Sequence, residues 1–222
     1  MSTTAEAPLA LYGFWRTSAT YRVRVALHLK NIPVQEHIVD LDAAEQRSAS
    51  YLAINPLGGI PTLLAPGQPP MTQSLAILEY LEELQPTPAL LPSDLAGRVR
   101  VRSLAGMLAT DTHPLITPRV RKYLASPCGL DAAGWRAWQE HWFSTGLLAV
   151  EQRLASESGT GLFCHGDAPG MADICLASIV AITRVFGISV APTPTIDRIV
   201  ARCHTLDAFA RADFHRQTGA PA

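Results

Sequence analysis

The sequence predicts an α+β fold in which a small mixed α/β domain is followed by an all-helical domain. Before residue 86, short apolar stretches and amphipathic stretches alternate in the order βαβ and then ββα. After residue 92 the strand patterns disappear. Between the two halves, the segment Pro86–Pro92 contains three prolines, which favour a stiff, extended linker. We therefore expect a first domain over residues 1–87 and a helical domain over residues 93–222.

The first domain opens with Leu9–Phe14, a short apolar stretch typical of a buried strand. Ser18 or Thr20 can cap the helix that follows, and the turn at residues 31–33 ends it. The later elements are expected in this order: a strand at Val34–Val39, a polar Ala-rich stretch to the turn at residues 55–59, short strands at Thr62–Leu64 and Pro70–Met71, and an amphipathic helix at Ser74–Leu84. This order predicts a small mixed sheet.

The second domain shows only helical patterns. Long helices are expected at Leu95–Ala109 and Trp135–Leu154. Pro169–Val185 is apolar almost all round, as is typical of a central buried helix. Thr193 followed by Pro194 fits an N-cap with proline at the first helical position. The second half is therefore predicted to be a helical bundle around the segment that ends at Val185.

Composition favours a water-soluble globule in the cytoplasm. The chain has 222 residues and is 48% hydrophobic, and its 18 Lys and Arg nearly balance 19 Asp and Glu, which argues against a nucleic-acid surface. Asp173 and Arg184 interrupt the longest apolar run, Met171–Val190, so we expect no membrane span. Met1–Pro8 has neither a basic start nor an apolar core, so we expect no signal peptide.

The cysteines indicate neither a disulfide framework nor a structural zinc site. They are scattered, with no CxxC spacing and no histidine at ligand spacing: Cys128, Cys164, Cys175 and Cys203. Idle thiols suit a reducing compartment, which again favours the cytoplasm.

Three spaced segments in the first domain carry the functional signal. They are Phe14–Arg22, where a strand ends in hydroxyls that open a helix, Gly59–Leu63, where an apolar–Pro pair leads into a strand, and Gln73–Ile77, where a polar pair starts a helix. Two helix N-termini beside an exposed strand edge form a cradle suited to a small acidic peptide.

Their order and spacing resemble the glutathione-binding domain of the glutathione transferases. The run Arg16–Leu29 is similar to the zeta class, the maleylacetoacetate and maleylpyruvate isomerases. The resemblance extends from about Leu9 to about Phe209. It implies a thioredoxin-like first domain, an all-α glutathione-transferase second domain, glutathione as cofactor and a homodimer.

Thr17 and Ser18 are expected to activate the thiol of glutathione. A free thiol has a pKa of about 8.5, and a helix N-terminus lowers it by stabilising the thiolate. A hydroxyl at this position can donate a further hydrogen bond, and the sequence leaves open which of the two residues does so. Zeta-class proteins usually have two serines and a cysteine here, but this chain has Ala19 in place of the cysteine. The nucleophile must then be the sulfur of glutathione.

The resemblance implies further contacts to glutathione in the first domain. The Ile60–Pro61 bond is expected to be cis, turning the backbone of Ile60 outward to pair with the cysteinyl residue. Gln73 and Ser74, at a helix N-terminus, are expected to hold the γ-glutamyl carboxylate. Gln46 occupies the family's position for a contact to the glycine end.

Additional site residues are expected in the helical domain. His113 stands where the zeta class has a glutathione-contacting Gln or His, although a histidine before proline is also common as a solvated helix end. Further contacts are expected at Thr117 and Arg119. By contrast, Asp173 is expected to be structural, because Met171-Ala172-Asp173 resembles a capping box in which Gly170 replaces the usual Ser or Thr.

Arginines are expected to bind the carboxylates of the substrate. Arg16 precedes the activating turn, and its planar guanidinium suits bidentate carboxylate binding. A second arginine is expected from the central helix of the second domain. Arg184 is the candidate, although the family position aligns with Val185, and one residue turns a side chain by about 100° around a helix.

The resemblance implies a glutathione-dependent cis–trans isomerase of aromatic-compound or tyrosine catabolism. The thiolate would add to the electron-poor double bond of a maleyl keto acid, a small dianionic organic acid, and bond rotation and elimination would release the fumaryl isomer. Two alternatives stay open: a transferase that conjugates or dehalogenates small α-halo acids, and a non-enzymatic binding protein with this fold. The sequence does not distinguish maleylacetoacetate from maleylpyruvate.

Overall fold

The computed structural model describes residues 9–221; the Met1–Pro8 segment, where no signal peptide is expected, lies outside the described residues. The chain forms two compact units. One contains the described residues of Met1–Pro88 and Asp207–Ala222, and the other is Ala89–Leu206. This grouping places residues 207–222 with the first unit, whereas we expected them in the helical domain. The domain ranges 1–87 and 93–222 stay a prediction.

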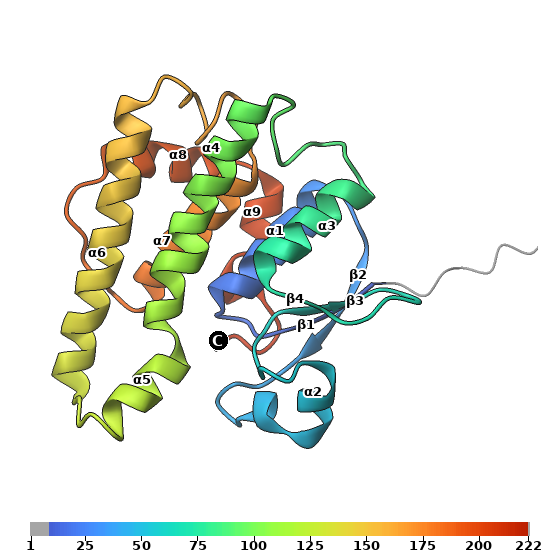
Figure 1. Cartoon of the computed structure of the whole chain (residues 1–222), viewed down its shortest axis with the longest axis vertical. Coiled ribbons are helices and arrows are strands. Elements are labelled where there is room, and N and C mark those ends of the chain that lie inside the picture. Colours follow the sequence, from blue (N-terminus) through green and yellow to red (C-terminus); the bar gives the residue numbers. More distant parts are fainter. Residues whose placement is uncertain (1–8, 222) are drawn as a thin grey trace, which may run out of the picture. The chain divides into compact units, whose positions relative to one another are not determined.

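The first unit is built around a four-stranded sheet with the order β2-β1-β3-β4 (Figure 1). Its elements are β1 (Leu9–Gly13), α1 (Ser18–Leu29), β2 (Val34–Ile38), the 3₁₀ turn η1 (Glu45–Arg47), α2 (Ala49–Ile54), β3 (Thr62–Leu64), β4 (Met71–Thr72), α3 (Ser74–Leu84), α9 (Asp207–Arg211) and the 3₁₀ turn η4 (Phe214–Arg216). The predicted order βαβ and then ββα is confirmed.

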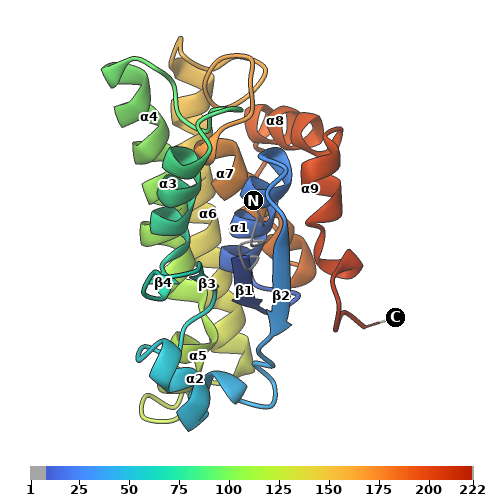
Figure 2. The ribbon, with the colours of Figure 1, turned by 90° about the vertical axis from the view of Figure 1, so that its right-hand side faces the viewer.

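The pairing of the strands follows from their connections. Helix α1 returns the chain so that β2 runs parallel to β1, and the short turn after β3 makes β4 antiparallel to it. Leu11 and Leu63 face each other across β1 and β3, and both are fully buried. Helices α1 and α3 pack together on one face of the sheet, whereas α2 lies on the other side (Figure 2). The N-termini of α1 and α3 therefore belong to the same layer.

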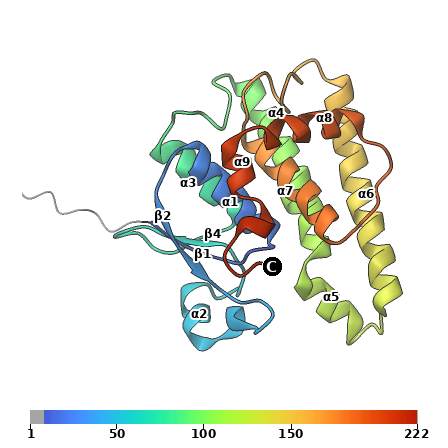
Figure 3. The ribbon, with the colours of Figure 1, turned by 180° about the vertical axis from the view of Figure 1, so that it is seen from behind.

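The C-terminal segment packs on α1 rather than continuing the helical unit. Helix α9 lies beside α1 (Figure 3). After it, the ring of Phe214 meets the ring of Tyr21 edge-on, with centroids 5.4 Å apart. Because Tyr21 and Phe214 lie near opposite ends of the chain, local periodicity could not indicate this contact.

The second unit is helical. Its elements are α4 (Leu95–Gly106), the π-helical segment η2 (Met107–Thr112), the 3₁₀ turn η3 (His113–Ile116), α5 (Pro118–Ala125), α6 (Ala132–Ser156), α7 (Met171–Val185) and α8 (Pro194–His204). Beyond Pro92 the described residues contain one isolated β-bridge, between Thr160 and Gly166, and no strand. None of the described helices has the length and apolarity needed to cross a membrane.

Helix α7 forms the core of the second unit, as predicted from its apolar pattern. Asp173 is almost fully buried in it, and its carboxylate accepts hydrogen bonds from the backbone N–H groups of Cys164 (2.7 Å) and Gly170 (2.9 Å). Burial raises the pKa of Asp173 to about 6 in spite of these bonds. A Cβ atom at Gly170 would lie only 2.8 Å from the carbonyl oxygen of Leu90, which explains glycine at this cap.

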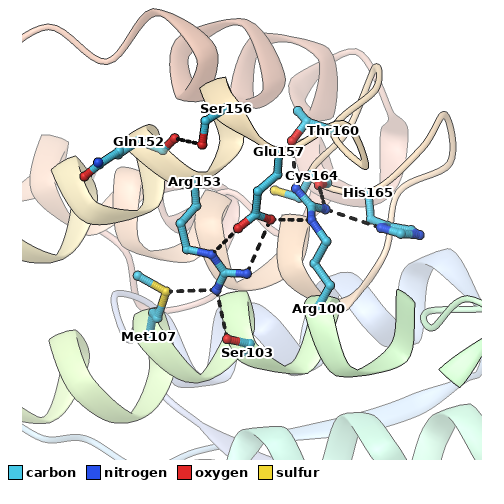
Figure 4. Close-up of polar contacts among 10 residues, drawn as sticks. All are labelled: Arg100, Ser103, Met107, Gln152, Arg153, Ser156, Glu157, Thr160, Cys164 and His165. Carbon is cyan, nitrogen blue, oxygen red and sulfur yellow. Dashed lines mark hydrogen bonds and ion pairs between the residues drawn. The ribbon is translucent and has the colours of Figure 1, made fainter. Parts of the chain in front are cut away.

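A cluster of polar side chains joins α4 to the end of α6 and the loop that follows (Figure 4). Arg100 donates to Glu157 (2.6 Å) and Thr160 (2.8 Å), while Arg153 donates to Glu157 (2.6 Å) and Ser103 (2.8 Å). The hydrogen bond from Arg153 and then that from Arg100 lower the pKa of the Glu157 carboxyl. The cluster fixes the start of the loop that leads to α7.

Several local expectations need correction. The helix expected at Leu95–Ala109 changes to a π-helical segment at Met107, where the Thr112 hydroxyl donates to the carbonyl of Met107. The Thr112 side chain also lies against Gly146, where a Cβ atom would overlap it. This contact between two helices favours the wider π-helix over a regular α-helix. Helices α2 and α5 were not predicted, because at six and eight residues each is too short to repeat an apolar spacing over several turns.

Candidate functional site

Thr17 and Ser18 lie at the N-terminus of α1, shortly after the end of β1. The N-cap is Thr17, with extended backbone angles, so the expectation that Ser18 or Thr20 caps this helix is wrong. The Thr17 hydroxyl does not cap the helix; it donates to the hydroxyl of Thr20 (2.6 Å) and lies 3.3 Å from the carbonyl of Phe14. Its hydrogen is therefore already engaged within the chain.

Ser18 differs from Thr17 because its hydroxyl oxygen has no hydrogen-bond partner among the described residues. The residue is 1% exposed, so water does not replace that partner. A buried polar group without a partner costs about 1–3 kcal/mol. Such a group at a helix N-terminus points to a ligand that completes its hydrogen bonding.

Gln46 provides a second orphaned polar atom. It lies in the turn η1, and its side-chain oxygen Oε1 is buried with no hydrogen-bond partner within residues 9–221. An amide oxygen accepts hydrogen bonds, so a peptide N–H of a ligand can satisfy it. The turn packs closely on Gly58, where a Cβ would lie 2.7 Å from the carbonyl of Gln46.

The Ile60–Pro61 peptide bond is cis, as predicted. Side chains of the α2 segment hold the backbone on both sides of it. Tyr51 and Asn55 each donate to the carbonyl of Gly59 (2.7 and 2.8 Å), and both contact the hydroxyl of Thr62. Among the described residues no group bonds to the backbone of Ile60 itself, which leaves it available as a strand edge. Sequence reasoning missed Tyr51 and Asn55.

The N-terminus of α3 has an unusual backbone. Gln73, its N-cap, adopts φ 69° and ψ 113°, a conformation that a non-glycine residue occupies at a cost of about 1–3 kcal/mol. Ser74 is the first residue of the helix and is 7% exposed. Its hydroxyl accepts a hydrogen bond (3.0 Å) from the guanidinium of Arg22, which belongs to α1 and was not predicted as a site residue.

Arg16 is held by a carboxylate of the same unit. Its two terminal nitrogens donate to the two oxygens of Asp42 at 2.9 and 2.5 Å. The guanidinium carbon also lies 5.2 Å and 5.4 Å from the ring centroids of Phe14 and Trp15. Side-chain exposures of 33% for Arg16 and 60% for Asp42 leave the pair accessible to solvent. An incoming carboxylate must therefore compete with Asp42.

In the helical unit, three of the expected residues lie in one segment. His113 opens the turn η3 directly after the π-helical segment, and Thr117 is the N-cap of α5. The Thr117 hydroxyl donates to the carbonyl of Pro114 (3.0 Å) rather than to the helix, and Arg119 is exposed in the first turn of α5. His113, Thr117 and Arg119 are therefore neighbours in sequence, at the junction between η3 and α5.

Arg184 lies elsewhere in the helical unit. It is exposed near the end of α7 and lines a cavity of about 180 Å³. Thr183 of α7, Thr193 before α8 and Asp197 in α8 also line this cavity. His113, Thr117 and Arg119 do not line this cavity. Val185, the position that aligns with the family's arginine, is half-buried.

Known proteins similar to this chain belong to one family. The N-terminal domain of the glutathione S-transferase family matches residues 18–84. A maleylpyruvate isomerase from a Ralstonia species is 41% identical over 204 residues, covering 92% of this chain and 96% of that protein.

Solved structures agree with this over nearly the whole chain. A maleylacetoacetate isomerase from Methylobacterium extorquens AM1, with bound malonate and GSH, is 49% identical with a TM-score of 0.94, covering 96% of this chain and all of that one. A holo maleylpyruvate isomerase, described as a bacterial zeta-class glutathione S-transferase, is 40% identical with a TM-score of 0.92 and the same coverage. The predicted architecture, a thioredoxin-like domain followed by a helical domain, is thereby confirmed.

Proposed function

Because this chain belongs to the zeta class of the glutathione transferases, the class of the maleylacetoacetate and maleylpyruvate isomerases, we propose that it converts a maleyl keto acid to its fumaryl isomer with glutathione as cofactor. The chain is an enzyme, so the non-enzymatic alternative is set aside. The observation in this chain that carries the proposal is the buried Ser18 hydroxyl without a partner at the N-terminus of α1.

The residues of the first unit fit glutathione. An orphaned hydroxyl at Ser18 suits the sulfur, an orphaned amide oxygen at Gln46 suits a peptide N–H, and the unpaired backbone of Ile60 suits the cysteinyl backbone. Ser74 at the N-terminus of α3 suits the γ-glutamyl carboxylate, because free N–H groups at a helix N-terminus favour an anion. Four separate features therefore match four separate parts of the tripeptide.

Bound glutathione supplies a thiolate that adds reversibly to the electron-poor double bond, so that the bond becomes free to rotate. The chain's own task is to keep that sulfur ionised at neutral pH. Ser18 donates its hydroxyl hydrogen to the sulfur, and the N-terminus of α1 adds the favourable end of its dipole. The Thr17 hydroxyl already donates to Thr20, so Ser18 is the principal donor and Thr17 supports it.

The second task is to bind a substrate that carries two carboxylates. Arg16 offers a planar guanidinium with two parallel donors, which it now gives to Asp42. For the helical unit we propose that His113, Thr117 and Arg119 contact glutathione. Arg184 is proposed as the second carboxylate ligand, with Arg119 as its substitute. The dicarboxylate malonate in the Methylobacterium relative is consistent with a dianionic substrate.

We propose that the active form is a cytoplasmic homodimer. Leu95 and Val99 lie one turn apart on α4 and are 83% and 67% exposed, which is unusual for large apolar side chains on a monomer. All four cysteines belong to the described residues and are free, and three of them are buried, as suits a reducing compartment. Equilibrium sedimentation of wild type and of a Leu95→Glu/Val99→Glu variant tests the dimer.

An absorbance assay with purified protein tests the activity. Maleylacetoacetate and maleylpyruvate are each followed with and without glutathione, beside a small α-halo acid such as chloroacetate, whose displacement by the thiolate releases chloride and leaves a stable S-carboxymethyl conjugate. Glutathione-dependent loss of the cis isomer without net consumption of glutathione supports the isomerase. Stoichiometric consumption of glutathione with the α-halo acid alone would favour the conjugating alternative.

The hydroxyls at the start of α1 are expected to set the pKa of the bound thiol. In Thr17→Val/Ser18→Ala, that pKa should rise by about one to two units, since a hydrogen bond to a charged group contributes about 1.5–3 kcal/mol. The acidic limb of the pH profile of kcat/KM should move upward by the same amount, while the affinity for glutathione stays nearly constant. Ultraviolet titration of the bound thiolate measures the shift.

The two single variants separate the hydroxyls. Ser18→Ala should reproduce most of the shift, and Thr17→Val should have a small effect, because the Thr17 hydrogen is bonded to Thr20. A thiol pKa unchanged in the double variant would show that the helix N-terminus alone stabilises the thiolate.

A further inference from the structure

Arg22 is a buried cation between the two helix N-termini of the first unit. It is 1% exposed and lies four residues after Ser18, so both side chains lie on the same face of α1. Its Nη1 donates to the Ser74 hydroxyl at 3.0 Å. Arg22 thus physically connects the helix that presents Ser18 with the helix that begins at Ser74.

We propose that Arg22 is a positioning residue for glutathione, acting through Ser74 on the α-carboxylate of the γ-glutamyl group. The inference rests on the proposed function, because it requires that glutathione bind at the N-terminus of α3. Arg22 itself does not touch the tripeptide. Its role is to decide which way the Ser74 hydroxyl points.

The argument depends on the direction of one hydrogen bond. A guanidinium has only donors, so the Ser74 oxygen must be the acceptor in its contact with Arg22. The contact with Arg22 is the one hydrogen bond of this hydroxyl within residues 9–221, so its hydrogen is unused. A serine hydroxyl that is free to rotate binds donors and acceptors equally. One that is held by an arginine presents its hydrogen, which is what a carboxylate requires.

The surrounding backbone favours the same ligand. Ser74 opens an eleven-residue helix whose first N–H groups have no partner within the helix. Gln73 holds a left-handed backbone directly before it, and strained backbone of this kind is concentrated at ligand sites. Hydrogen bonds to a charged donor also polarise the acceptor hydroxyl, which makes its own hydrogen a stronger donor.

Calorimetric titration of the full chain with two ligands tests the proposal. One ligand is glutathione, and the other is 4-aminobutyryl-cysteinylglycine, which lacks only the α-carboxylate of the γ-glutamyl group. In wild type, glutathione should bind more tightly than the analogue. In Arg22→Gln, affinity for glutathione should fall about tenfold and affinity for the analogue should stay constant. Ser74→Ala should behave in the same way, and the double variant should be no weaker than Ser74→Ala alone.

The matched control is Glu82→Gln. Lys30 and Glu82 form another buried contact between α1 and α3, with Nζ and Oε2 2.8 Å apart. Weakening that contact should lower Tm without changing the ratio of the two affinities. If Arg22→Gln does not fold, Arg22→Lys is titrated instead. Its affinity for glutathione should fall about three- to fivefold and its affinity for the analogue should stay constant, because a lysine ammonium can donate a hydrogen bond but lacks the planar guanidinium.

Two results would overturn the inference. An equal loss of both ligands in the Arg22 variants would reveal a structural role only. The second is a ratio of the affinity for glutathione to that for the analogue that falls in Ser74→Ala but stays at the wild-type value in Arg22→Gln or Arg22→Lys. That result would keep Ser74 as the carboxylate ligand and remove Arg22 from the site. Wild-type protein that binds neither ligand would instead refute the proposed function and the inference together.

Discussion

Arg16→Met is expected to lower kcat/KM for maleylacetoacetate and maleylpyruvate by about one to three powers of ten, with a raised KM and almost unchanged affinity for glutathione. A charge-assisted hydrogen bond contributes about 1.5–3 kcal/mol, and each 1.4 kcal/mol is a factor of ten. Arg16 can make two such bonds to a carboxylate. Steady-state kinetics with both substrates, together with calorimetry for glutathione, measure the two quantities separately.

The ion pair with Asp42 provides an opposite control. Asp42 accepts a hydrogen bond from each terminal nitrogen of Arg16 and so competes with the substrate carboxylate. Asp42→Asn weakens this competition and should lower KM. The pair is partly exposed, so this effect should be small and should shrink in high salt. Wild-type turnover in Arg16→Met would show that a residue other than Arg16 binds the carboxylate of the substrate.

Lys30→Met is expected to lower the free energy of unfolding by about 3–5 kcal/mol, the cost of breaking a buried ion pair from one side. Lys30 is fully buried, and its ammonium donates to the carboxylate of Glu82 (2.8 Å) and to the carbonyls of Gln85 (2.6 Å) and Pro88 (2.7 Å). These bonds use all three donors of the ammonium. The substitution leaves the Glu82 carboxylate buried beside an apolar side chain. Urea unfolding followed by circular dichroism measures the loss.

A double variant separates the cost of leaving Glu82 without Lys30 from the loss of the ion pair itself. Lys30→Met/Glu82→Leu removes both charges, so it should recover most of the stability lost in the single variant. A single variant within about 1 kcal/mol of wild type would show that Glu82 takes up a proton or reaches water. Activity per folded molecule should be unaffected, since neither residue belongs to the proposed site.

The sequence alone was enough for the helices and strands that follow from short-range patterns. Helix α3 begins at Ser74 and ends at Leu84, as its apolar spacing predicted, and β3 covers Thr62–Leu64. Periodicity and proline placement are properties of neighbouring residues, so they do not depend on contacts between distant segments. The resemblance carried by the first-domain segments likewise identifies the family.

Partners that are far apart in the chain could not be predicted in this way. Arg22 and Ser74 are 52 residues apart, and Arg16 and Asp42 are 26 apart. No spacing rule links such pairs, because their contact depends on the register of a sheet and on how two helices pack. The sequence showed two adjacent hydroxyls at Thr17 and Ser18, and only the folded chain distinguishes the one bonded to Thr20 from the buried one without a partner.

Tertiary packing also overruled local preference in two segments. Residues 107–112 have a helical pattern but form a π-helix, where Thr112 packs against the space left by Gly146. The C-terminal helix α9 follows the helices of the second unit in sequence, yet it packs on α1. The fold class and the order of the elements thus follow from local sequence. Long-range packing determines which of the hydroxyls of Thr17 and Ser18 is left without a partner, which groups bind Arg16 and Arg22, and where the last helix lies. Burial and hydrogen-bond geometry exist only once distant segments meet.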